Sequence, residues 1–203
     1  MTEVLKTRYV KQLLEHVWAF KPNPRSFGGV SYLLRRTRGN LLVDAPIFDT
    51  ATFEVFDELG LPTHVFVTHR DDVAEVHRFR EKYGVPIIIH ESERDEIPGG
   101  ADITFNDKYK LDEEILLIHT PGHSPGGVSY AIDDLVFTGD ALFLGSIGRT
   151  DGPGGSFETL VASITTRLFS LSNETVVYPG HGPKSTIGVE KRSNPFVGEE
   201  RVK

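Results

Sequence analysis

The sequence contains no cysteine. Disulfide bonds, thiolate metal ligands and a cysteine nucleophile are therefore excluded. It also lacks any run of the roughly 18 apolar residues that a membrane-spanning helix requires. The N-terminal stretch MTEVLKTRYVKQLLEH has no apolar core of the kind that a secretory signal carries. These absences predict a cytoplasmic protein without a membrane partner.

The sequence also has no excess of basic residues. The chain has 22 lysines and arginines against 29 aspartates and glutamates, and its formal net charge is −7. Proteins that bind the nucleic-acid backbone usually present a basic face, so the composition argues against a nucleic-acid partner. With 203 residues, 38% of them hydrophobic, the chain is expected to form a single domain over residues 1–203. The sequence leaves the oligomeric state open.

Hydrophobic periodicity alternates between strands and helices in both halves of the chain. Asp72 is expected to cap a helix that ends at Gly84, with Glu75 completing a capping box, and Ser156 is expected to cap a second amphipathic helix. Strands are expected at residues 16–20, 29–36, 41–43, 64–68, 85–90, 115–119, 128–132, 135–138 and 175–178, and a further helix at residues 51–59. This pattern predicts an α/β protein with sheets covered by helices.

Four apolar runs each end in a residue that can bind a metal. These are HVFVTH at His69, LLIHTPGH at His123, LVFTGD at Asp140 and TVVYPGH at His181. Rigid scaffolds commonly place functional side chains where strands feed into loops. Taken singly, each residue has an ordinary explanation as a hydrogen-bonding loop residue. Three imidazoles and a carboxylate from separate strands together predict a site for zinc, iron or manganese.

The sequence resembles the metallo-β-lactamase superfamily and, within it, the small glyoxalase II-like hydrolases. The resemblance is carried by Thr68-His69 and by the segments HTPGHSPGGVSY at residues 119–130, FTGDALF at 137–143, GRTDGPGGS at 148–156 and VYPGHGPKSTIGVEKRSNPF at 177–196. It implies a four-layer αββα sandwich, the metallo-β-lactamase fold. It also implies that the metal-site positions are His69, His123, Asp140 and His181.

One family motif is incomplete in this chain. The signature His-x-His-x-Asp-His reads HRDDVA over residues 69–74. Val73 and Ala74 stand where the signature has Asp and His and cannot coordinate an ion, so the resemblance implies that the second metal is lost. Asp71 replaces the second histidine and is either a substitute ligand or a solvent-facing group paired with a cation such as Arg70. We therefore expect one divalent metal ion, zinc by preference, with iron or manganese as alternatives.

Three functions are compatible with these residues. The first is a metal-dependent hydrolase of a small ester or thioester, with Asp140 or Asp71 orienting or deprotonating the attacking water. The second is a mononuclear Fe(II) oxygenase resembling the persulfide dioxygenases, in which the residues matching His69, His123 and Asp140 hold the iron. The third is a binding module that has lost its metal site and catalysis.

Two further residues lie on loops beside the expected metal centre. Arg149 and Lys184 are candidates for contact with a small-molecule substrate. For Arg149 the alternative is an interaction with Asp151 that ties the loop together, and for Lys184 it is an exposed position without a functional role.

Overall fold

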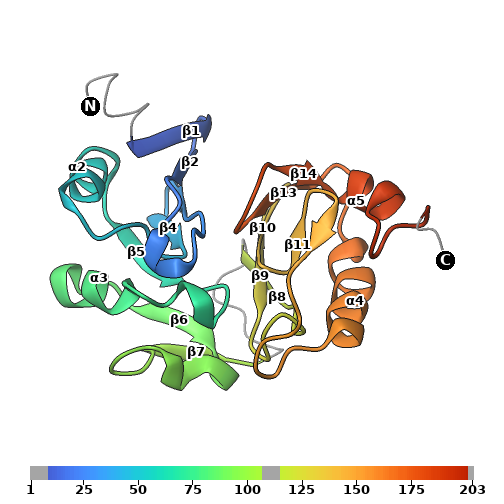
Figure 1. The fold of residues 1–203 in the computed structure, drawn as a ribbon. Helices are drawn as coiled ribbons and strands as arrows, with labels where there is room; N and C mark the ends of the chain where they lie inside the picture. Colours follow the sequence, from blue (N-terminus) through green and yellow to red (C-terminus); the bar gives the residue numbers. More distant parts are fainter. Residues whose placement is uncertain (1–8, 107–114, 201–203) are drawn as a thin grey trace. The chain divides into compact units, whose positions relative to one another are not determined.

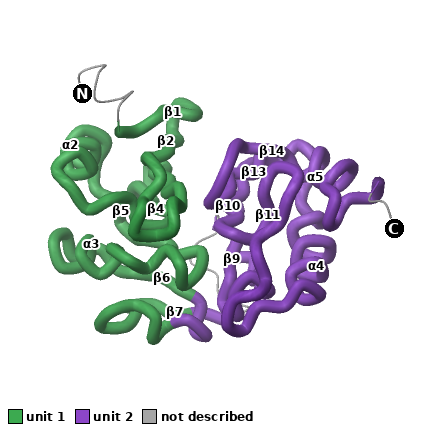
Figure 2. Tube along the Cα trace, viewed as in Figure 1, with its two compact units in different colours: residues 1–89, 94–104 green, residues 90–93, 105–203 purple. Residues whose placement is uncertain are grey.

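The computed structural model describes residues 9–106 and 115–200. The chain divides into two compact units (Figure 2), one comprising residues 1–89 and 94–104 and the other residues 90–93 and 105–203. The expectation of one domain over residues 1–203 stays a prediction. Among the described residues, no helix combines the length and the apolar character that crossing a membrane requires.

The first unit is built on a seven-stranded sheet (Figure 1). Its strands follow the order of the chain. They are β1 (Val10–Leu14), β2 (Val17–Phe20), β3 (Tyr32–Leu34), β4 (Asn40–Val43), β5 (Pro62–Phe66), β6 (Ile87–His90) and β7 (Ile103–Phe105). Neighbours from β1 to β4 are antiparallel, whereas β4, β5 and β6 are parallel. Parallel strands need crossover connections, and α2 (Thr50–Leu59) and α3 (Val76–Tyr83) lie in these connections.

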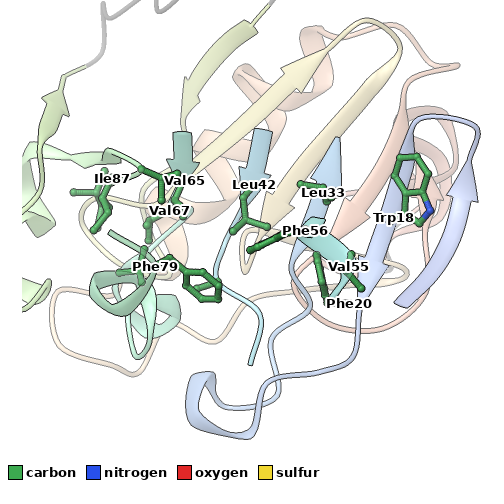
Figure 3. Packing of buried hydrophobic residues seen from close by; sticks show 14 of the residues in the cluster. Trp18, Phe20, Leu33, Leu42, Val55, Phe56, Val65, Val67, Phe79 and Ile87 are labelled. Atoms are coloured by element: carbon green, nitrogen blue, oxygen red, sulfur yellow. The ribbon is translucent and has the colours of Figure 1, made fainter. Parts of the chain in front are cut away.

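The two helices bury their apolar faces against one face of this sheet. Phe56 of α2 and Phe79 of α3 meet edge to face, with ring centroids 5.8 Å apart. Side chains alternate between the two faces of a strand, so each strand sends only some of its residues into this cluster. The sheet residues labelled in Figure 3 are Trp18, Phe20, Leu33, Leu42, Val65 and Ile87, and Val67, labelled with them, directly follows β5.

The expected capping box before α3 is wrong. Residues Arg70–Asp72 form a short 3-10 helix, η2, and α3 begins only at Val76, after Glu75. The Glu75 side chain makes no capping hydrogen bond. Its buried carboxylate instead accepts hydrogen bonds from Arg25 at 2.7 Å and Arg78 at 2.8 Å. Glu75 is therefore engaged by two arginines rather than by the start of the helix, and Asp72 lies in η2, before the helix begins. The expected end of the helix is confirmed, because Gly84 adopts a left-handed conformation there.

The second unit contains a five-stranded sheet in the order β14-β13-β10-β9-β8. Its strands are β8 (Ile115–His119), β9 (Val128–Ile132), β10 (Leu135–Gly139), β13 (Val176–Pro179) and β14 (Ser185–Thr186). Only β10 and β13 pair in parallel, and the other neighbours are antiparallel. A separate two-stranded ribbon, β11 (Leu142–Phe143) and β12 (Ser146–Ile147), follows β10 directly.

Two helices, α4 (Phe157–Thr166) and α5 (Ile187–Ser193), complete this unit (Figure 1). The predicted cap of α4 is confirmed, because Ser156 Oγ accepts a hydrogen bond from Thr159 N at 3.2 Å. Leu160 and Ile164 of α4 pack with apolar residues of the sheet in one cluster, whose sheet members include Ile118, Ala131, Val136 and Val177. Short 3-10 helices at Pro24–Ser26, Glu91–Glu96 and Leu168–Ser170 occupy connections of the chain.

Candidate metal centre

Three of the predicted metal ligands come together in the second unit. Asp140 follows β10 and His181 follows β13. Because these two strands are parallel neighbours, their carboxyl ends meet at one edge of the sheet. The Nε2 atom of His181 lies 3.5 Å from Asp140 Oδ2, and the Nε2 atom of His123, from the loop after β8, lies 3.9 Å from the same oxygen. One carboxylate oxygen therefore faces two imidazole nitrogens.

Two glycines leave the space that this arrangement needs. A β-carbon at position 180 would lie 2.6 Å from Asp140 Oδ1, and one at position 148 would overlap the main-chain oxygen of Asp140. Only glycine allows such close approach. Gly180, after β13, thus makes room for the Asp140 carboxylate, and Gly148, after β12, makes room for its main-chain oxygen.

The proton position on His123 follows from its hydrogen bond. Nδ1 of His123 lies 2.8 Å from the main-chain oxygen of Arg149. A carbonyl oxygen can only accept, so Nδ1 carries the proton and the lone pair of the neutral ring lies on Nε2. Nε2 is the atom that faces Asp140. Metal-binding histidines are commonly oriented by such a partner on the second ring nitrogen.

In the first unit, a hydrogen-bonded chain orients His69. Thr68 Oγ1 donates to Asp44 Oδ2 at 2.9 Å and lies 2.9 Å from His69 Nδ1, so the hydroxyl accepts from this nitrogen. The lone pair of His69 is thereby placed on Nε2. Asp44 also accepts from Thr68 N at 2.7 Å and adopts a left-handed backbone conformation with φ of 56°. Such a conformation is uncommon for a residue other than glycine, and no local sequence signal indicated this role for Asp44.

Residues 71–74, which follow His69 and Arg70, differ in their burial and contacts. Asp71 lies on η2 and is half-buried, whereas Asp72 is buried with Oδ2 3.5 Å from His69 Nδ1. Val73 packs against the apolar cluster of the first unit, and Ala74 is exposed. The roles of His69 and Asp71 as metal ligands, which rest on the sequence, stay predictions.

The two candidate substrate-side residues differ in their surroundings. Arg149 Nε donates a hydrogen bond to Asp151 Oδ1 at 2.8 Å. This hydrogen bond is the main cause that lowers the pKa of the exposed Asp151 carboxyl below its usual value. Arg149 and Asp151 therefore tie their loop together, as the sequence suggested. Lys184 is exposed in the segment between His181 and β14, and contact of Arg149 or Lys184 with a substrate stays a prediction.

A buried carboxylate that sequence reasoning missed holds the ribbon next to Asp140. Glu190 of α5 is fully buried. Its Oε2 accepts from Gly145 N at 3.0 Å and from Asn194 Nδ2 at 2.7 Å, and its Oε1 accepts from Ser185 Oγ. Asn194 Nδ2 also lies 3.1 Å from the oxygen of Ser146. The turn of the β11–β12 ribbon is thus fixed to α5.

The fold and these residues define a metallo-β-lactamase-type protein. A family model, described as the metallo-beta-lactamase superfamily, matches residues 25–181, and the chain belongs to this superfamily. The chain is 36% identical over 165 residues to the probable metallo-hydrolase YqgX of Bacillus subtilis, a match that covers 69% of this chain and 78% of YqgX. It is 48% identical over 86 residues to the hydroxyacylglutathione hydrolase GloC of Haemophilus influenzae, a match of 41% of either chain. The match to GloC thus spans less than half of that enzyme.

Solved structures confirm the expected fold. BLEG-1, a B3 metallo-beta-lactamase, superimposes with a TM-score of 0.82 at 29% identity, covering 89% of this chain and 99% of that one. TTHA1623, solved in a di-iron-bound form, gives 0.77 at 31% identity, with coverage of 88% and 98%. ETHE1 from Myxococcus xanthus gives 0.75 at 30% identity, with coverage of 95% and 86%.

Proposed function

We propose that this protein is a metal-dependent hydrolase that cleaves a small ester or thioester and uses one divalent ion. The observation that carries the proposal is the position of Asp140 Oδ2, which faces the Nε2 atoms of both His123 and His181. The hydrolase names of YqgX and GloC support the reaction class. The name of GloC also suggests glutathione thioesters as the first substrates to examine.

The residues of the second unit fit a divalent metal chemically. Two imidazole nitrogens and a carboxylate oxygen form a donor set that suits zinc, iron or manganese, and we propose zinc. His123 is already held in the tautomer with its lone pair on Nε2 by the Arg149 carbonyl. His69 and Asp71 are the further ligands that the sequence predicts. Since Val73 and Ala74 offer no ligand atom, we propose one ion per chain rather than two.

A bound divalent ion supplies Lewis acidity, which lowers the pKa of bound water and polarises a carbonyl group. The chain itself must place an acceptor for the proton of the attacking water. Asp140 is the candidate in the second unit, because its carboxylate lies between the two imidazoles. Asp71 is the second candidate, proposed from its place in the family signature.

The test combines metal content with turnover. The protein should be purified without chelator or affinity-tag metal, and its metal per chain should be measured together with hydrolysis of hydroxyacyl and acyl thioesters of glutathione. We expect about one zinc per chain and thioester hydrolysis that stops on chelation and returns with zinc. The variant His16→Ala, which changes an exposed histidine of the β1–β2 turn, should match the wild type. Zinc-loaded protein that hydrolyses none of these thioesters would contradict the proposal.

A second candidate function is a non-haem iron oxygenase. The sequence predicts His69, His123 and Asp140 as its iron ligands, two histidines and one carboxylate, the ligand type that favours Fe(II). The proximity of His123 Nε2 to Asp140 Oδ2, 3.9 Å, supports two members of this set. TTHA1623, a relative in structure, was solved with two irons. About one iron per chain, with oxygen uptake in the presence of glutathione persulfide, would favour this function over hydrolysis. Protein that binds no added ion would instead favour the non-catalytic binding module.

A further inference from the structure

An apolar surface adjoins the metal-site histidine of the second unit. The ring of Phe143, on β11, lies edge-on to the imidazole of His181, with centroids 6.0 Å apart and planes at 86°. Leu144, the next residue, is 46% exposed. The ribbon that carries both residues begins two residues after Asp140. Phe143 thus adjoins one proposed ligand, His181, and follows another, Asp140, closely in the chain.

The two faces of this ribbon differ in what they contact. Leu142 pairs with Ile147, and both are buried in the apolar cluster of the second unit. Phe143 pairs with Ser146 on the opposite face, where both residues are only partly buried. The core therefore accounts for Leu142 and Ile147, but packing in the core does not account for Phe143 or Leu144.

Polar interactions hold the ribbon in place. Thr138 Oγ1 donates to the oxygen of Leu142 at 2.8 Å, and Glu190 accepts from Gly145 N at 3.0 Å. Asn194 donates to the oxygen of Ser146 at 3.1 Å. Because these groups fix the main chain on either side of Phe143 and Leu144, the two apolar side chains are presented on a preorganised support. Apolar side chains that are in place before the ligand binds are one feature of a small-molecule site.

We propose that Phe143 and Leu144 bind the apolar part of the substrate's acyl group. The inference rests on the proposed function for the position of the reacting carbonyl at the metal centre. An acyl chain extending from that carbonyl past His181 would cover Phe143 and Leu144 and remove apolar surface from water. Binding should then strengthen with chain length, by up to about fourfold for each methylene that becomes buried. Acyl groups with apolar chains are therefore the expected substrate class, rather than acetyl groups.

The experiment is a titration with straight-chain carboxylates, followed by NMR of the backbone amides. Acetate, butyrate, hexanoate and octanoate are added to the metal-loaded protein and to the metal-free protein. We expect the affinity to rise along the series and the amides of Leu144 and Gly145 to shift with the longer chains. Leu144→Ser should weaken hexanoate binding by about tenfold while leaving acetate binding unchanged.

A matched control is available on the same unit. Leu116 of β8 is 55% exposed and lies on the strand at the far end of the sheet order from β14 and β13. Leu116→Ser should bind every carboxylate as the wild type does. Phe143→Leu, which keeps an apolar side chain, should retain a chain-length dependence. Equal affinity for acetate and octanoate, or chain-length dependence that is unaltered in Leu144→Ser, would overturn the inference.

The same series separates this inference from the proposed function. If octanoate binds at Leu144 but thioesters of every chain length stay intact, the hydrolase proposal fails and the apolar surface stands. If thioesters are hydrolysed without preference for chain length and Leu144→Ser has no effect, the hydrolase proposal stands and the acyl-binding surface fails.

Discussion

The hydroxyl of Thr68 donates a hydrogen bond to the carboxylate of Asp44 across 2.9 Å, although 24 residues separate them in the chain. The same hydroxyl accepts from Nδ1 of His69, which places the lone pair of that ring on Nε2. Thr68→Val removes both interactions from a buried site. Because the Asp44 carboxylate then loses one hydrogen-bond donor, the free energy of unfolding should fall by about 1–3 kcal/mol. Chemical denaturation measures this change.

The same variant, Thr68→Val, is also expected to change the affinity for the metal ion. If His69 is a ligand, losing its orienting partner should weaken metal binding by about 10–100-fold, measured by competition with a chromophoric chelator. Thr68→Ser keeps the hydroxyl and should restore most of the affinity. Wild-type affinity in Thr68→Val would contradict the assignment of His69 as a ligand.

Asp140 is central to the proposed metal site, since its Oδ2 faces both His123 and His181. Asp140→Asn keeps the shape of the side chain but removes the charge, so tight metal binding should be lost. Elemental analysis after dialysis measures the loss, and near-UV circular dichroism shows that the protein stays folded. Asp134→Asn, an exposed aspartate in the turn before β10, should keep its metal. Full metal content in Asp140→Asn would refute the site.

Glu190 should contribute to stability through three donors that converge on its buried carboxylate, from Gly145, Ser185 and Asn194. In Glu190→Met, an apolar side chain of similar length replaces the carboxylate, so all three donors lose their acceptor. We expect the free energy of unfolding to fall by about 1–3 kcal/mol. Glu174→Met, at an exposed position before β13, is the control and should leave it unchanged. Equal stability of the two variants would show that the carboxylate is not needed.

The sequence predicts the longer elements of the fold well, because each has enough residues to show a period. Strands β8, β9 and β10 and the capped helix α4 lie where the apolar pattern places them. Strands β11, β12 and β14 have two residues each, too few for any alternation to be seen. Helix α5 was not predicted either. Asp72, at the end of the 3-10 turn Arg70–Asp72, and Glu75 imitate a capping box, so the pattern predicts a helix start three residues before α3 begins at Val76.

The sequence likewise predicts some residues of the candidate site and misses others. Residues at the ends of strands, such as Asp140 and His181, could be found because parallel neighbours bring their carboxyl ends together. The partners that orient or support the site could not be found. Asp44 lies 24 residues from Thr68, and Glu190 lies 45 residues from Gly145. No local pattern reports hydrogen bonds over such separations, because they depend on how the strands pair.

The incomplete signature offers a last prediction, because the two substituted positions have different surroundings. Val73 packs against the apolar cluster of the first unit, whereas Ala74 is exposed. Restoring both signature residues with Val73→Asp and Ala74→His places a carboxylate against apolar side chains. The free energy of unfolding should fall by about 1–3 kcal/mol, while the metal content stays at the wild-type value.

The single variant Ala74→His separates the two effects. Position 74 is exposed, so the free energy of unfolding and the metal content of Ala74→His should both match those of the wild type. Chemical denaturation and elemental analysis of the two variants and the wild type give the comparison. If the double variant binds a second ion without loss of stability, the packing of Val73 against the apolar cluster does not stabilise the protein, and the prediction is wrong. Loss of stability without a second ion would mean that position 73 serves packing in this protein, and that restoring the two signature residues does not create a second metal site.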